Sequence, residues 1–102
     1  MINLLKNKPD DRSQDVKEYQ NTFILNVIAH LGESEGMLER LTLESGLLPN
    51  QLRDEMTQPE VQAGIIDFLL SDEPLLIQFC ENHRILPAEI WKIRLKLPGA
   101  PV

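Results

Sequence analysis

The sequence has 102 residues, a formal net charge of −6, 42% hydrophobic residues and one cysteine. This length predicts one domain with one modest core. A lone cysteine cannot form an intrachain disulfide, so the chain is not one of the disulfide-framed scaffolds of secreted proteins. We therefore expect a reducing, cytoplasmic location. The sequence has neither the basic start and apolar run of a signal peptide nor about 20 apolar residues in a row, so it predicts no export signal and no membrane span.

The charges divide the chain unevenly. Residues 33–81 hold eleven acidic side chains and two basic ones, whereas residues 82–102 hold four basic side chains and one acidic. An acidic middle repels phosphate backbones at long range, and it also keeps a protein soluble. The charge pattern therefore favours a solvated acidic surface over a nucleic-acid site.

Residues 1–14 carry Pro9, a run of charges and no apolar spacing, so we expect a mobile amino-terminal arm. From Asp15 to Gly32 apolar residues recur three and four positions apart, which predicts a helix that buries one broad face. The face is expected to comprise Val16, Tyr19, Phe23, Ile24, Val27, Ile28 and Leu31.

Two short helices are expected next. Ser34 stands as the cap of a helix that ends at Gly46, a residue that accepts the left-handed conformation common at helix ends. Pro49 suits the first turn of the following helix, where its missing N–H has no helical partner to lose.

Three further helices complete the expected domain, residues 15–97. The segment from Pro59 to Leu70 is apolar on most sides and is predicted to be the central helix. Asp72 caps the next helix, and a last helix follows Pro87. Residues 93–97 also alternate like a strand, but no partner strand exists, so helix or extended coil is expected there. Residues 98–102 are expected to form a short carboxyl-terminal tail.

The two halves of this domain align when Pro49 is placed on Pro87. Residues 23–53 and 61–91 then share two leucines, a glutamate and a proline at matching positions, and many other pairs keep their residue type. The pattern predicts an all-α bundle of about six helices built from two pseudo-repeated three-helix units that pack on each other.

The sequence resembles a family of small all-helical proteins of unknown function from alphaproteobacteria. The resemblance covers roughly residues 17–98 and is most specific in the run Asp67-Phe-Leu-Leu-Ser-Asp-Glu-Pro-Leu-Leu-Ile-Gln-Phe-Cys80, with Leu86-Pro-Ala-Glu-Ile90 after it. The run from Leu41 to Arg53 also contributes. The sequence departs from the pattern at residues 82–84, where a small residue and a glycine are expected. The resemblance implies an all-helical cytoplasmic protein and implies no activity or cofactor.

Few residues could support catalysis. The two histidines and the cysteine do not form a catalytic or metal-ligating pattern, because His30 lies on the apolar side of its helix and His83 has only Cys80 nearby in sequence. His30 is expected at the edge of the core, and Cys80 as a packing residue. Gly64, in mid-helix, is expected to permit close approach of another helix. We therefore expect no enzyme activity, no catalytic residue, no metal and no cofactor.

One function hypothesis is a helix-turn-helix-like DNA-binding regulator. The run from Leu41 to Leu52 has the spacing of that motif, with Gly46 in the turn. Its recognition face, residues 50–55, carries more acidic than basic side chains, which disfavours contact with a polyanion. The second half offers Lys92, Arg94 and Lys96 instead, but nucleic-acid binding remains the weaker alternative.

The favoured hypothesis is a module that binds another protein or a second copy of itself. Three polar positions of the first unit, Glu39, Arg53 and Glu55, align with apolar residues in the second. Such residues are either covered within the fold or form a patch for a partner. The expected contacts are Ile77, Trp91 and Ile93, bordered by Arg84 and Lys92.

Overall fold

The computed structural model describes residues 9–99, with the backbone alone for residues 9–14, and this range contains six α-helices. This range contains no strand, so the expected all-α architecture is confirmed. None of these helices combines the length and the apolar character needed to cross a bilayer. In chain order the helices are α2 (Pro9–Gly32), α3 (Met37–Ser45), α4 (Pro49–Asp54), α5 (Pro59–Leu70), α6 (Glu73–His83) and α7 (Pro87–Leu95).

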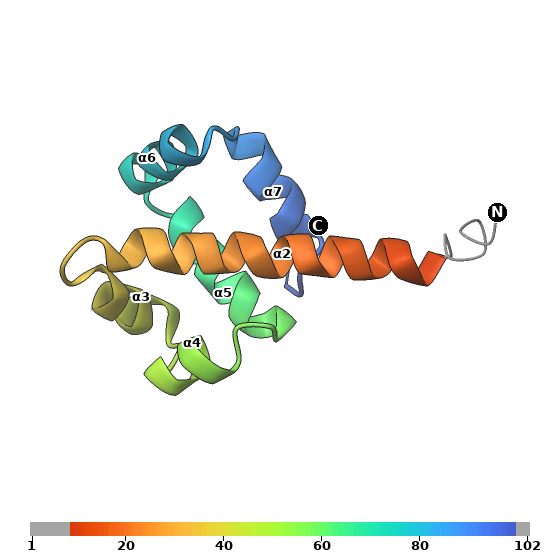
Figure 1. Ribbon diagram of the computed structural model, residues 1–102. Helices are drawn as coiled ribbons and strands as arrows, with labels where there is room; N and C mark the ends of the chain where they lie inside the picture. The colour runs from red at the N-terminus through yellow and green to blue at the C-terminus, as the bar shows by residue number, and fades with distance from the viewer. Residues whose placement is uncertain (1–8, 100–102) are drawn as a thin grey trace.

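Helix α5 is the centre of the fold, as its apolar sequence predicts. It contacts α2, α3, α6 and α7, and seven of its twelve residues are buried. In Figure 1 it crosses α2, with α3 and α4 on one side of α2 and α6 and α7 on the other. Because these four helices pack on α5, their contacts with α5 determine which side of each helix is buried and which side faces solvent.

Helix α2 is longer than the body on which it packs. Phe23, Val27 and Leu31 are buried, but Val16 and Tyr19 are exposed, so the prediction that the buried face begins at Val16 is wrong. Figure 1 shows the reason: the first turns of α2 extend past the other helices. The helix also begins at Pro9, so residues 9–14 of the expected arm are helical, and the rest of the arm lies outside the described residues.

The helix ends follow mostly from local sequence. Asp72 caps α6 as expected, accepting a hydrogen bond from the Leu75 N–H (3.2 Å). The expected cap at Ser34 is wrong, because α3 begins after Gly36, which adopts the left-handed conformation and makes no side-chain cap bond. A glycine at that position completes the turn without a capping side chain.

The alignment of the two halves also matches several helix ends. With Pro49 at the start of α4 placed on Pro87 at the start of α7, the last residue of α2 falls on that of α5, and the last residue of α3 on that of α6. The N-cap amides of α4 and α7, at Leu48 and Leu86, donate to the side chains of Gln51 (2.8 Å) and Glu89 (3.2 Å). Whether the two three-helix units superpose in space stays a prediction.

Two left-handed corners lead into α4 and α7. Gly46 follows α3 with φ 79°, and Arg84 follows α6 with φ 54°. Arg84 is the one non-glycine residue with positive φ in the described range. Its Cβ strains this conformation, whereas Gly46 has no Cβ.

We expect Arg84→Gly to raise the free energy of unfolding by about 1 kcal/mol, since glycine removes the left-handed strain. Urea unfolding followed by circular dichroism measures the change. Gly46→Ala, at the matching corner, should lower the stability by a similar amount. A loss of stability in Arg84→Gly would show that contacts of the arginine outweigh the strain.

Candidate partner-binding surface

Helix α7 has one side in the core and the other side in solvent. The buried side chains follow the spacing of one helix face: Ile93 and Arg94 come three and four positions after Ile90, and Leu97 comes four positions after Ile93. The side chains one turn apart on the other side are Trp91, 46% exposed, and Leu95, 59% exposed. A tryptophan and a leucine at i and i+4 on a helix form one apolar row. We call Trp91 and Leu95 the apolar row of α7.

Of the three apolar residues that the sequence predicts as partner contacts, two are exposed in the structure and one is buried. Trp91 and Ile77, 45% exposed on α6, lie at the surface. Ile93 is 5% exposed and packs in the core, so its assignment to a surface patch is wrong. The prediction assumed that Glu55, which aligns with Ile93, is an exposed position. Glu55 is in fact partly buried, and the matching position of α7 faces the core. Leu95, which the sequence reading missed, lies one turn after Trp91.

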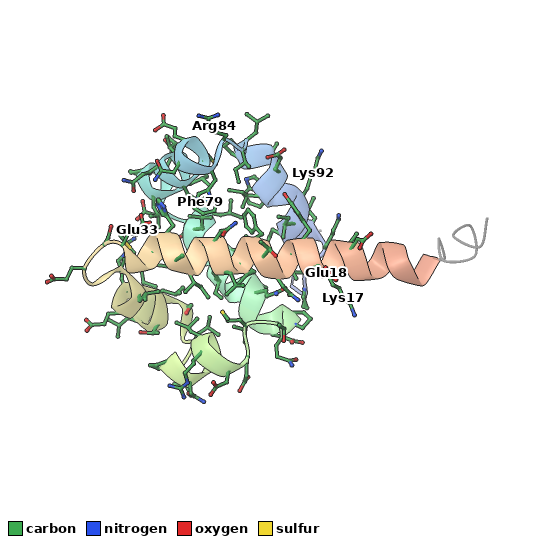
Figure 2. The ribbon with its side chains drawn as sticks, viewed as in Figure 1. Lys17, Glu18, Glu33, Phe79, Arg84 and Lys92 are labelled. Carbon is green, nitrogen blue, oxygen red and sulfur yellow. The ribbon has the colours of Figure 1, made fainter. Side chains whose placement is uncertain are left out.

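The two expected basic neighbours are exposed. Figure 2 labels Arg84 and Lys92 at the outer edge formed by α6 and α7. Lys96, the C-cap of α7, is exposed as well. None of the three makes an ion pair with a described residue of the chain.

Arg94 does not belong to this basic surface. Its side chain is buried, and its Nε and Nη2 donate to the two carboxylate oxygens of Asp67 on α5 at 2.6 and 3.1 Å. Its Nη1 donates to the carbonyls of Leu97 (3.3 Å) and Pro98 (3.0 Å). Arg94 stands four residues after the buried Ile90 and so lies on the same side of α7. Its guanidinium therefore joins α7 and the residues after it to α5.

A groove of about 420 Å³ lies between the end of α3 and α5. Its hydroxyls bond the carbonyls of their own helices, Ser45 to Leu41 (2.6 Å) and Ser71 to Phe68 (2.7 Å). Its acidic residues also have partners: Arg40 pairs with Glu44 (2.7 Å), and Arg94 with Asp67. The groove therefore has no polar group aimed at a ligand. Its lining residues are Glu44, Ser45, Gly64, Asp67, Phe68 and Ser71.

Gly64 allows close packing beside this groove. A Cβ at this position would lie 3.2 Å from Cδ1 of Leu47. The sequence predicts another helix as the close neighbour of Gly64. The structure shows instead a side chain of the connection between α3 and α4, to which Leu47 belongs.

The histidines and the cysteine serve packing. His30 is buried at the core edge, as expected, with its ring 5.3 Å from that of Phe79, and the ring of His83 is 4.3 Å from Phe79. Burial, with a smaller effect from the charge of Glu89, raises the pKa of the Cys80 thiol. A raised pKa disfavours the thiolate, the reactive form. Among the described side chains, residues 15–99, no three His, Cys, Asp or Glu residues are grouped to hold a metal ion.

The helix-turn-helix-like corner is formed by α3 and α4. Helix α4 is six residues long, and its Arg53 pairs with the neighbouring Asp54 (3.1 Å). In the second half, Arg94 is buried against Asp67. Two of the basic side chains considered for phosphate contacts are therefore already paired with carboxylates.

Residues 19–100 match the model of a family described as "Protein of unknown function (DUF3572)". The match covers about four-fifths of the chain and agrees with the expected resemblance to a family without assigned activity, while the alphaproteobacterial origin stays a prediction. Comparisons with curated proteins and with solved structures gave no match.

Proposed function

We propose that this chain, which belongs to the DUF3572 family of proteins of unknown function, acts by binding another protein and not by catalysis. The observation that carries the proposal is the apolar row of α7, in which Trp91 and Leu95 face away from the core. Tryptophan is the residue type that most often dominates the energy of protein interfaces.

The exposed side chains could supply enough energy for a specific complex. Burial of a large apolar side chain on association is worth roughly 1.5 to 3 kcal/mol before the entropic costs of binding. Trp91 and Leu95 are about half exposed, and Ile77 on α6 adds a third apolar side chain. Together they support a complex of modest affinity, with Arg84 and Lys92 as polar contacts at its border.

The chemistry of the remaining residues supports a non-catalytic role. The thiol of Cys80 is buried with a raised pKa, which makes it a poor nucleophile. The guanidinium of Arg94 and the carboxylate of Asp67 are bound to each other. A lone buried cysteine also fits the proposed cytoplasmic location.

Trp91→Ala tests the proposal, because it should separate binding from folding. We expect it to lower the free energy of unfolding by less than about 1 kcal/mol, since the ring is half exposed, and to weaken partner binding at least about tenfold. A photo-reactive residue at position 95 would trap the partner in cells of the native host. The trapped protein, identified by mass spectrometry and purified, is then titrated calorimetrically against the wild type and Trp91→Ala.

Leu43 provides the matched control. It is 83% exposed on α3, on the other side of α2 from α7, so a photo-reactive residue there probes an apolar position outside the proposed surface. Trapping of the same proteins from positions 43 and 95, or equal affinities for the wild type and Trp91→Ala, would contradict the proposal.

A further inference from the structure

We infer that the partner presents an acidic amphipathic helix to α7, an inference that rests on the proposed function and adds the partner's chemistry. Helix α7 and its C-cap carry two rows side by side. The apolar row is Trp91 and Leu95, and the next position in each turn gives the basic row, Lys92 and Lys96. Successive residues are about 100° apart around a helix, so both rows face solvent together.

The basic side chains of residues 15–99 that make no ion pair with another described residue gather near this helix. Seven basic side chains lie in residues 15–99, and Arg40, Arg53 and Arg94 make ion pairs with carboxylates of the chain. The other four are Lys17, Arg84, Lys92 and Lys96, and three of these belong to α7 or to the corner before it. In a protein of net charge −6 this distribution leaves one surface suited to an acidic partner.

The acidic residue at the start of α7 does not neutralise these lysines by an ion pair. Glu89 accepts a hydrogen bond from the Leu86 N–H at 3.2 Å, which places its carboxylate at the helix start. No ion pair joins it to Lys92 in the described structure. The basic row therefore remains available to carboxylates from outside the chain.

The size and charge of the surroundings favour a protein segment over an extended polyanion. Helix α7 has nine residues, a length of about 14 Å, which matches two to three turns of a partner helix. Rows spaced by four residues on one helix fit the grooves of another. A membrane or a DNA duplex presents negative charge over an area much larger than α7 and would meet more of a protein whose net charge is −6, whereas a short acidic helix contacts α7 alone.

Three synthetic helical peptides test the inference with the full-length chain. They share a leucine face and differ only in whether the polar face carries glutamate, glutamine or lysine. Trp91 is the single tryptophan of the chain, so its emission reports binding at α7 directly. We expect the glutamate peptide to shift this emission to the blue and to bind at least about tenfold more tightly than the glutamine peptide at low salt, a preference that added salt reduces.

Charge reversal provides the matched variants. Lys92→Glu should remove the preference for the glutamate peptide. Lys17→Glu, the same change at an exposed lysine of α2, should leave it intact. Arg84 is left unchanged because its left-handed backbone couples substitution there to stability.

Each other outcome overturns the inference in a distinct way. Equal binding of the glutamate and glutamine peptides would show that α7 binds through its apolar row alone. The proposed function would then stand, and the acidic partner would be rejected. Failure of every peptide to shift the emission would reject the acidic helix, while trapping from position 95 tests the proposed function separately. A blue shift with phosphatidylglycerol vesicles but not with phosphatidylcholine vesicles would show that α7 binds an anionic membrane surface. A blue shift with duplex DNA would show that it binds nucleic acid. Self-association that shields Trp91 would make a second copy the occupant.

Discussion

Replacement of Phe79 by alanine should lower the free energy of unfolding by about 3 to 5 kcal/mol. The side chain is 1% exposed, and its ring lies 5.6 Å from Phe23 on α2, in an edge-to-face arrangement, and 4.3 Å from His83. Truncation would leave a cavity between α2 and α6 and remove favourable aromatic contacts. A domain of this size has about 5 to 15 kcal/mol of stability in total, so the variant would be close to unfolding at warm temperatures. Urea unfolding followed by circular dichroism measures the loss.

Ile77→Ala is the control within the same helix. Ile77 stands two residues before Phe79 and is half exposed, so we expect its truncation to cost about 0.5 to 1 kcal/mol. Similar losses for the two variants would contradict the assignment of Phe79 to the core and of Ile77 to the surface.

Asp67→Asn should cost about 2 to 3 kcal/mol although Asp67 lies largely in solvent. Its side chain is 57% exposed, whereas that of its partner Arg94 is 5% exposed. Asparagine keeps one oxygen that can accept from Arg94 but carries no charge, so the buried guanidinium loses its counter-charge and one of its two bonds to residue 67, and keeps its bonds to the carbonyls of Leu97 and Pro98. The cost is below that of a fully buried pair, since solvent screens the exposed carboxylate. Calorimetric unfolding at neutral pH provides the measurement.

Arg94→Met should be less harmful than Asp67→Asn. Methionine fills much of the same space and leaves no buried charge, and the exposed carboxylate of Asp67 is then hydrated by solvent. A larger loss in Arg94→Met would show that the bonds to Leu97 and Pro98 contribute more than the ion pair.

The sequence predicted those features that a few neighbouring residues determine. The proline starts of α4 and α5, the cap at Asp72 and the left-handed Gly46 all depend on local backbone chemistry. The central position of α5 was also predictable, because a helix that is apolar on most sides needs neighbours around it.

The candidate surface was only partly predictable, because exposure depends on which side of a helix its neighbours cover. Ile93 and Leu95 are both apolar residues of α7, yet one is buried and the other exposed. Arg94 reads as a surface base in the sequence, because no neighbouring residue indicates that Asp67 on α5 lies opposite it. In the same way, Val16 continues the buried face of α2 in sequence but lies beyond the body.

The projecting start of α2 also makes a convenient point of attachment for engineering. From Pro9 to Tyr19 the helix extends for about 15 Å, and Val16 and Tyr19 are exposed and lie outside the core, which begins at Phe23. A fluorophore or a surface tether joined near Val16 would thus stand clear of the packed helices. Such an attachment point lies on a different helix from Trp91 and Leu95, so the protein could be immobilised through α2 and tested for partner binding through α7.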